Sequence, residues 1–304
     1  MALFEVRVPI ATVWTEPDAP RHVDRPAVLD DPDLGSWTAA MDAEVRGGLK
    51  GRILTQLLLG EGVRIVEEQA DWVKVVALVQ PSSLDPVGYP GWVRRAHLGA
   101  PVPREDGATA LVTAPSAVCD LEAGPRVELS FGTVLWVDDI DEQRVTVLLP
   151  DGRRGVLPLE DVRLSNKGEQ PTNGVGDPLA DARRFLGLRY LWGGTSSFGL
   201  DCSGLVHLVY RAQGVVIPRD AFDQVEAVDP VALDEVRPGD LYFFARPGER
   251  VYHVGFVSRP VGRDGSRWML HAPEGGELIE DAPLALHRRD SLVAAGRLPM
   301  PHSG

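Results

Sequence analysis

An aspartate, a cysteine, a serine and a glycine stand together at residues 201–204, and this motif has the residue types for nucleophilic chemistry. A glycine-rich stretch, WGGTSSFG, precedes the motif, and the apolar spacing that follows the cysteine is typical of a helix. Asp201 is a suitable N-cap, so Cys202 is expected in the first helical turn. There the positive helix end lowers the pKa of a thiol, and neighbouring backbone N–H groups can stabilise an oxyanion. The motif therefore indicates a thiolate nucleophile.

Two histidines on expected strands have the chemistry to move the protons that such a nucleophile needs. If the strands form a hairpin in which Phe256 lies opposite Trp268, the same register places His253 opposite His271. Directly opposed side chains are about 4.5–5.5 Å apart at Cβ, so the second imidazole would fix the tautomer of the first. A slip of one residue would put the two rings on opposite faces.

Other interpretations of these residues stay open on the residues alone. A cysteine on a helix is commonly a small buried apolar residue, and a histidine on a strand is commonly a satisfied polar residue. Cys119 follows no glycine-rich stretch and begins no helix, so we expect it to be structural. A zinc site made of Cys202, His253 and His271 lacks a pair of ligands at close spacing. No metal and no cofactor are expected.

Composition restricts the class of protein. The 304 residues carry a net charge of −13, which argues against binding to nucleic acid or an anionic membrane. No apolar run approaches the roughly 20 residues that span a bilayer, and the first residues do not have a signal-peptide pattern. Two cysteines cannot form a disulfide framework. We therefore expect a cytoplasmic protein of two or three domains, and the composition indicates no particular oligomeric state.

The elements that position the motif change in character along the chain. Up to residue 165 the patterns are β-rich, with a hairpin-like pair of runs over 62–79 and one stretch of helical spacing over 35–59. Residues 108–164 repeat the β pattern in smaller form, which predicts two diverged copies of a small barrel. Two helical patterns and three strands follow a polar linker, and this order predicts an α+β domain.

Five motifs that follow one another in this order resemble those of the NlpC-type cysteine peptidases of bacterial cell walls, whose fold is papain-like. They are Tyr190-x-Trp192-Gly193-Gly194, Asp201-Cys202-Ser203-Gly204-Leu205-Val206, Pro238-Gly239-Asp240-Leu241, His253-Val254-Gly255 and His271-Ala272. The N-terminal repeats resemble bacterial SH3-like domains. The implied fold is two small all-β SH3-like barrels followed by an α+β papain-like catalytic domain. The expected boundaries are a first barrel with a helical insertion at 1–100, a second barrel at 105–165, a linker at 166–176 and the catalytic domain at 177–304.

The resemblance implies a role for each catalytic residue. Cys202 matches the nucleophile, His253 the general base and acid, and His271 the residue that orients the base. Tyr190 matches a tyrosine whose hydroxyl lies at the oxyanion site. These roles are expectations until the geometry is known.

The resemblance also implies substrate-binding residues. Asp201 and Ser203 match residues that line a γ-D-glutamate pocket, and Asp220 matches an aspartate that holds the free amino end of the peptide. Related enzymes often carry a serine where this chain has Ala221, so we expect this chain to make one hydrogen bond fewer to substrate.

One subgroup of the family uses its first SH3-like domain to supply a tyrosine and an acid to that amino group. Tyr89 is the candidate tyrosine, although a turn aromatic that packs on Trp92 is an equally good interpretation. Glu61 is the candidate acid, with Glu44 as its rival.

The implied function is hydrolysis of the γ-D-glutamyl–diamino acid bond in murein peptides that have a free N-terminal L-Ala, releasing L-Ala-γ-D-Glu in cell-wall recycling. The alternatives are an endopeptidase on intact peptidoglycan, with the SH3-like domains as wall anchors, and an acyltransferase that uses the same thiol.

Overall fold

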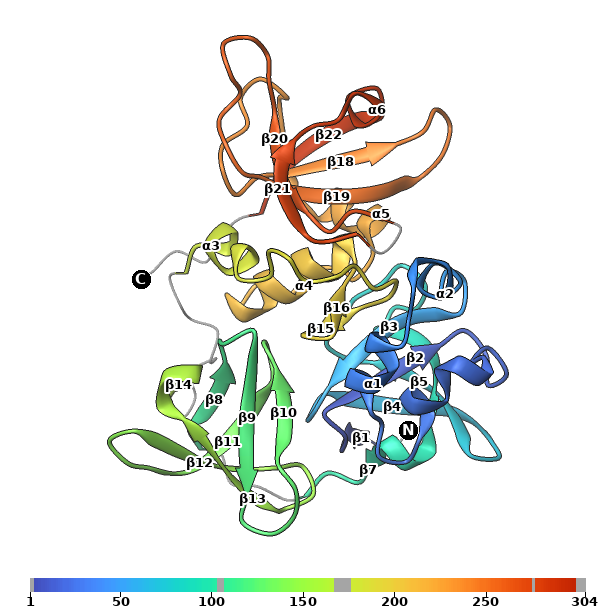
Figure 1. Ribbon diagram of the computed structural model, residues 1–304, viewed down its shortest axis with the longest axis vertical. Helices are drawn as coiled ribbons and strands as arrows, with labels where there is room; N and C mark the ends of the chain where they lie inside the picture. The colour runs from blue at the N-terminus through green and yellow to red at the C-terminus, as the bar shows by residue number, and fades with distance from the viewer. Residues whose placement is uncertain (1–2, 103–106, 167–175, 275–276, 299–304) are drawn as a thin grey trace.

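The protein is described by a computed structural model that covers residues 3–102, 107–166, 176–274 and 277–298. The linker expected at 166–176 lies almost entirely outside the described residues. The described chain forms two antiparallel β-sheets and an α+β unit, so the expected fold class is confirmed at this level. In Figure 1 the first sheet is at the lower right, the second at the lower left, and the C-terminal unit above both. No helix within the described ranges is long and apolar enough to cross a membrane.

The first sheet has seven strands in the order β3-β2-β6-β5-β4-β1-β7. The hairpin expected over 62–79 is present as two paired strands whose turn contains Ala70. The strands of this sheet are β1 (Leu3–Val6), β2 (Ile10–Trp14), β3 (Ile53–Leu58), β4 (Gly62–Gln69), β5 (Trp72–Ala77), β6 (Tyr89–Arg94) and β7 (Leu98–Gly99), with the 3₁₀ turn η2 (Arg95–His97) before the last.

The second sheet repeats the first. Its order is β10-β9-β13-β12-β11-β8-β14, which is the order of the first sheet with every strand number raised by seven. The repeat expected from the sequence is therefore confirmed as a repeat of topology, and Cys119 is buried in the core of this second copy. The strands are β8 (Thr109–Val112), β9 (Ser116–Leu121), β10 (Val127–Ser130), β11 (Val134–Ile140), β12 (Arg144–Leu148), β13 (Arg154–Pro158) and β14 (Val162–Ser165), with η3 (Leu159–Asp161) before the last.

The segment 35–59 is not one helix, so that expectation is wrong over most of its length. Two short helices form instead, α1 (Leu34–Ala39) and α2 (Ala43–Gly47), after a 3₁₀ helix η1 (His22–Val28). Gly51 has a φ of +77°, a conformation that ends helical structure, and the apolar run that follows becomes the edge strand β3. Apolar spacing alone did not distinguish this buried strand from a helix.

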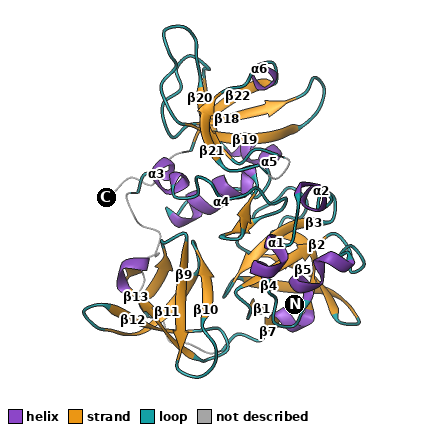
Figure 2. Cartoon of the chain, viewed as in Figure 1, coloured by secondary structure: helices purple, strands orange, loops and turns teal. Residues whose placement is uncertain are grey.

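The C-terminal unit has a six-stranded sheet in the order β17-β22-β18-β19-β20-β21, with α4 against one face (Figure 2). Val254, Phe256 and Leu270 share a core with α4, and the rings of Tyr210 and Phe256 stack with centroids 5.9 Å apart. The elements are α3 (Pro178–Arg183), β15 (Thr195–Ser196), β16 (Gly199–Leu200), α4 (Cys202–Ala212), α5 (Ala221–Gln224), η4 (Val225–Ala227), β17 (Asp229–Val231), β18 (Leu241–Ala245), β19 (Val251–Val257), β20 (Trp268–His271), β21 (Glu280–Pro283), α6 (Leu286–Arg289) and β22 (Leu292–Arg297).

The helix α4 lies where the three parts meet. All but one of its residues are buried, which explains why its apolar pattern runs around most of its circumference. The hairpin β15–β16 delivers its first residue, and the contact is tight: a Cβ on Gly204 would lie 2.2 Å from the carbonyl oxygen of Gly194. The glycines of this segment therefore let the loop backbone rest directly on the helix start.

Candidate active site

The start of α4 is built around the carboxylate of Asp201. Its Oδ1 accepts the backbone N–H of Gly204 at 2.6 Å, so the expected N-cap is confirmed. Its Oδ2 accepts the backbone N–H of Gly193 at 2.9 Å, which ties the glycine-rich loop to the same carboxylate. This double attachment holds Cys202 in the first helical turn, as the sequence predicted.

The expectation that the helix end lowers the pKa of Cys202 is wrong for this structure. Burial raises the pKa of the thiol to about 12, and the negative charge of Asp201 raises it further. Hydrogen bonds from the backbone N–H groups of Val254 and Ser203 lower the pKa of the thiol, but their effect is smaller than that of burial. The thiol is therefore protonated near neutral pH, and it needs a base to become a nucleophile.

The two histidines meet, although not in the expected register. β19 and β20 pair Phe256 with Leu270, two residues away from the expected partner, Trp268. A shift of two keeps the same face, so His253 and His271 become diagonal neighbours with His253 Nε2 2.8 Å from His271 Nδ1. Gly255 makes room for this: a Cβ there would lie 2.8 Å from the Cβ of His271.

Both imidazoles are neutral in the folded protein. Burial lowers the pKa of His253 well below its usual range, and His271 and Arg288 add to this effect. Burial lowers the pKa of His271 to about 3, again with a contribution from Arg288. His253 Nδ1 is buried and has no hydrogen-bond partner among the described residues. His253 directly precedes Val254, and the backbone N–H of Val254 donates to the Cys202 sulfur. The unpartnered Nδ1 of His253 is therefore a base on the strand that contacts the thiol.

Tyr190 is brought to the same place. The residue is 4% exposed, and its pKa is raised by burial and then by its electrostatic interactions with Cys202 and Asp201. Its backbone is fixed on both sides, since its N–H donates to the carbonyl of Glu277 at 2.8 Å and its carbonyl accepts Arg46 Nη1 at 3.2 Å. A phenol that stays protonated beside the thiol is suited to donate a hydrogen bond to an oxyanion.

A second polar pair joins the first sheet to the C-terminal unit. The Tyr89 hydroxyl donates to Asp220 Oδ2 at 2.8 Å, so the structure brings together two residues that lie far apart in the sequence. Burial raises the pKa of Asp220 above its usual range, and the neighbouring guanidinium of Arg219 opposes that rise. The Arg219 guanidinium donates its hydrogen bonds to Asp201, Ser203 and Thr55, and among the described residues it makes none to Asp220.

Arg219 is a residue whose importance the sequence did not indicate. It is fully buried, and it holds Asp201 with two hydrogen bonds of 3.0 and 2.8 Å. It also donates to Ser203 Oγ at 3.0 Å and, through Nε, to Thr55 Oγ1 of the first sheet at 2.9 Å. Asp201 and Ser203 thus lie beside the thiol as expected, but both are already bound within the protein. An arginine directly before an expected functional aspartate was the only available signal.

Glu61 is not brought to this cluster. Its Oε1 accepts Arg211 Nη1 at 2.6 Å, and Arg211 lies in the last turn of α4, about 13 Å along the helix from Cys202. The expected role of Glu61 in holding a substrate amine is not supported by this position. Its rival, Glu44, is exposed on α2. No group of three or more His, Cys, Asp or Glu among the described residues is arranged to hold a metal ion.

Comparisons with known proteins agree with this geometry. The profile of the NlpC/P60 family matches residues 187–295. The gamma-D-glutamyl-L-lysine dipeptidyl-peptidase of Bacillus subtilis is 37% identical over 276 residues, which is 89% of this chain and 90% of the relative. The enzyme of the same name from Bacillus cereus is 34% identical over 92% of this chain and 85% of its own length. A crystal structure of an NlpC/P60 family protein from Bacillus cereus superposes with a TM-score of 0.91 at 32% identity, covering 99% of this chain and 100% of that one.

Proposed function

Because this chain belongs to the NlpC/P60 family and is a cysteine peptidase, we propose that it acts on murein peptides with a free N-terminal L-Ala. It hydrolyses the bond between γ-D-glutamate and a diamino acid and releases L-Ala-γ-D-Glu. The names of its two relatives support lysine as that diamino acid. The observation that carries the proposal is the part-buried Tyr89–Asp220 pair, which provides a negative site for an ammonium group.

In this proposal Cys202 is the nucleophile and His253 is the base. Nδ1 of His253 takes the proton from the Cys202 sulfur, and the thiolate attacks the γ-carbonyl carbon of D-glutamate. The Tyr190 hydroxyl and a backbone N–H at the start of α4 stabilise the oxyanion. The imidazolium then protonates the leaving amine, which leaves a thioester, and water hydrolyses that thioester with His253 again acting as base. His271 orients His253 throughout. Both histidines are held neutral, so the imidazolium forms only during turnover.

Recognition of the amine follows from the electrostatics of Asp220. Burial makes its carboxylate costly in the free protein, and an ammonium group bound there would remove that cost. An acylated amine has no charge and cannot provide this compensation, so the same site selects against peptides still attached to glycan.

The two sheets then act as a gauge of substrate length rather than as wall anchors. We propose that they are SH3-like units over 1–100 and 105–165, before the catalytic domain at 177–304. The first supplies Tyr89 to the amine site. A peptide with a free amine is a product of wall breakdown, so the proposal places the enzyme in the cytoplasm, where such peptides are recycled.

The test compares L-Ala-γ-D-Glu-L-Lys with its N-acetylated form. We expect rapid cleavage of the free peptide, slow cleavage of the acetylated one, and no cleavage of either by Cys202→Ala. Tyr89→Phe removes one hydrogen bond from Asp220 and is expected to raise KM for the free peptide about tenfold, the effect of roughly 1.4 kcal/mol.

Equal rates on the free and acetylated peptides would refute the amine site and favour action on intact wall. Activity that survives in Cys202→Ala would refute the mechanism. Peptide transfer to an added amine in preference to water would identify an acyltransferase instead. Cleavage measured by mass spectrometry distinguishes these products.

A further inference from the structure

A histidine in the third catalytic position leaves the direction of proton transfer undetermined. The 2.8 Å contact between His253 Nε2 and His271 Nδ1 can form in two ways, because either nitrogen of a neutral imidazole can carry the hydrogen. If His253 Nε2 donates, its Nδ1 keeps a free lone pair and can act as a base. If His271 Nδ1 donates, the hydrogen of His253 sits on Nδ1 and the base is blocked. A carboxylate in that position would have excluded the second arrangement, and a histidine does not.

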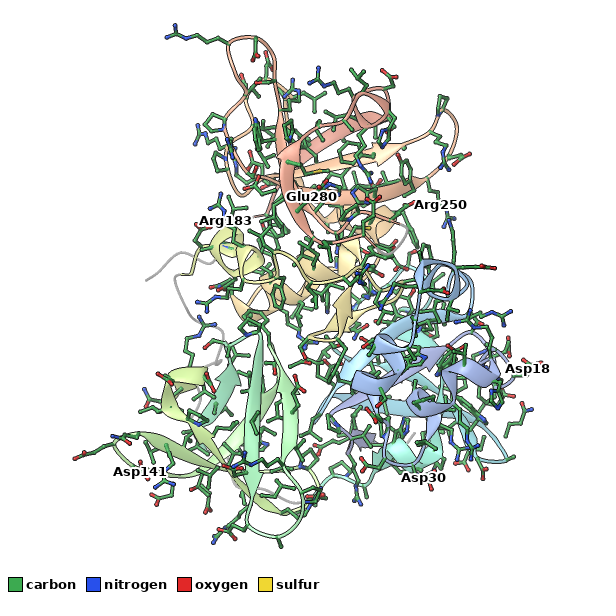
Figure 3. The ribbon with its side chains drawn as sticks, viewed as in Figure 1. Asp18, Asp30, Asp141, Arg183, Arg250 and Glu280 are labelled. Carbon is green, nitrogen blue, oxygen red and sulfur yellow. The ribbon has the colours of Figure 1, made fainter. Side chains whose placement is uncertain are left out.

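The structure has a carboxylate one step further out. β20 and β21 pair His271 directly with Glu280, and Glu280 Oε1 lies 3.4 Å from His271 Nε2. Figure 3 labels Glu280 on β21, the edge strand of the sheet that carries the two histidines. The Glu280 side chain is 52% exposed, so solvent reaches this contact, and its 3.4 Å separation exceeds that of an ordinary N–H···O hydrogen bond. Among the described residues, Glu280 is the carboxylate within ion-pair distance of either imidazole.

We propose that Glu280 is a positioning residue that fixes the tautomers of both histidines. An ionised carboxylate only accepts hydrogen bonds, so His271 carries its hydrogen on Nε2 and accepts at Nδ1. His253 then donates from Nε2, and its Nδ1 is left as the acceptor. This chain of hydrogen bonds ends at His253 Nδ1, which is buried and unpartnered in the structure, as a base that accepts a proton must be. The direction of the hydrogen bond between the two histidines therefore follows from the Glu280 carboxylate, which cannot donate.

The other charged groups near His271 do not provide this function. Glu274, Glu277 and Arg288 line a cavity of about 320 Å³ with His271 and Glu280. Arg288 is a cation, which adds to burial in lowering the pKa of both imidazoles but cannot accept a hydrogen from Nε2. Glu274 lies close enough to influence Tyr190 and Cys202, on the thiol side of the site.

The direct test is nitrogen-15 NMR of the histidine rings, which reports the tautomer without any substrate. Signals are assigned with His253→Gln and His271→Gln. We expect both rings of the wild-type protein to be Nε2–H at pH 7. In Glu280→Lys the new side chain only donates, so His271 should change to Nδ1–H and His253 should follow it. A wild-type His271 that is Nδ1–H, or tautomers that do not change in Glu280→Lys, would overturn the proposal.

The kinetic test rests on the proposed function, whereas the spectra do not, so the two hypotheses can fail separately. We expect kcat to fall in the order Glu280→Gln, Glu280→Ala, Glu280→Lys, with KM for the free tripeptide unchanged. The loss is a fewfold for glutamine, whose amide oxygen still accepts, and about a hundredfold or more for lysine, which stabilises the wrong tautomer. Glu249→Gln removes a similarly exposed carboxylate of the same unit and should leave kcat unchanged. Equal kcat in the glutamine and lysine variants would contradict a role in tautomer choice.

Discussion

The two N-terminal sheets have the same strand order, and their corresponding edge strands both contact the hairpin that delivers Cys202. In the first sheet this edge strand is β3, where Gln56 Oε1 accepts Ser196 Oγ at 2.8 Å and Thr195 N–H at 3.2 Å. In the second sheet it is β10, where Ser130 Oγ accepts Ser197 N–H at 3.1 Å. One edge therefore holds two hairpin residues and the other holds the next one.

The two edge strands differ in the further polar contacts that their residues make with the C-terminal unit. Within β3, Thr55 accepts a hydrogen bond from the buried Arg219, and the Ile53 carbonyl accepts one from Trp192 of the glycine-rich loop at 3.0 Å. Next to β10, Arg211 at the far end of α4 donates to the Gly132 carbonyl at 3.5 Å. Glu61, between β3 and β4, also accepts Arg211 Nη1 at 2.6 Å, so both sheets support the far end of α4. The first sheet in addition positions the thiol, and this is the task in which the two copies differ.

The largest effect that tests this comparison is expected at Arg219. Arg219→Met leaves the Asp201 carboxylate buried without its cation, which should cost about 3–5 kcal/mol in the free energy of unfolding. It also shifts the N-cap that holds Cys202, so kcat/KM should fall by about a hundredfold or more. Chemical denaturation and peptide hydrolysis measure the two effects separately.

Arg211→Met is the matched control at the other end of α4. It removes the partner of the buried Glu61 and should lower the free energy of unfolding by a similar amount. Because Arg211 is about 13 Å along the helix from the thiol, kcat of the folded fraction should change less than about twofold. Equal losses of kcat in the two variants would mean that both ends of α4 merely support the fold.

A smaller effect is expected from the hydroxyl that links Arg219 to the first sheet. Thr55→Val keeps the shape of the side chain but removes the acceptor of Arg219 Nε and the donor to Gln80, at a cost of about 1–3 kcal/mol. We expect a fewfold loss of kcat/KM, because the cation that holds Asp201 loses its own support. Thr12→Val is the control: its hydroxyl is buried in the same sheet without a partner among the described residues, so its removal should be neutral or stabilising. A loss of activity in Thr12→Val equal to that in Thr55→Val would remove the special role of the Arg219 contact.

The sequence predicted those parts of this arrangement that rest on local patterns. Asp201 caps α4 because an aspartate before a helical pattern satisfies the free N–H groups, and alternation placed both histidines on one face of the sheet. The register error of two residues did not affect that result, since the side chains of a strand alternate with a period of two. The helix expected at 35–59 was wrong because a buried edge strand and a helix share the same apolar composition over a short run.

The parts that could not be predicted depend on burial and on distant contacts. The positive helix end suggested a low pKa for Cys202, but burial of the thiol raises that pKa instead, and burial is a property of the assembled domains. Arg219 and Glu61 are charged residues whose neighbours in the sequence form no pattern that indicates burial. Each is buried by a partner from another part of the chain, so no local pattern distinguishes them from solvated charges.

The smallest effect is expected where the second sheet touches the hairpin. Ser130→Ala removes the acceptor of the Ser197 N–H and the partner of its hydroxyl, which should cost about 1 kcal/mol in the free energy of unfolding. Gln56 still holds Thr195 and Ser196, which pair with Leu200 and Gly199 just before Asp201. The start of α4 therefore keeps its position, and kcat/KM should stay within about twofold of wild type. Thermal unfolding and peptide hydrolysis, measured on the same preparation, give both values. A large loss of activity with little loss of stability would show that the second edge also positions the thiol, and the division of tasks between the two sheets would then be wrong.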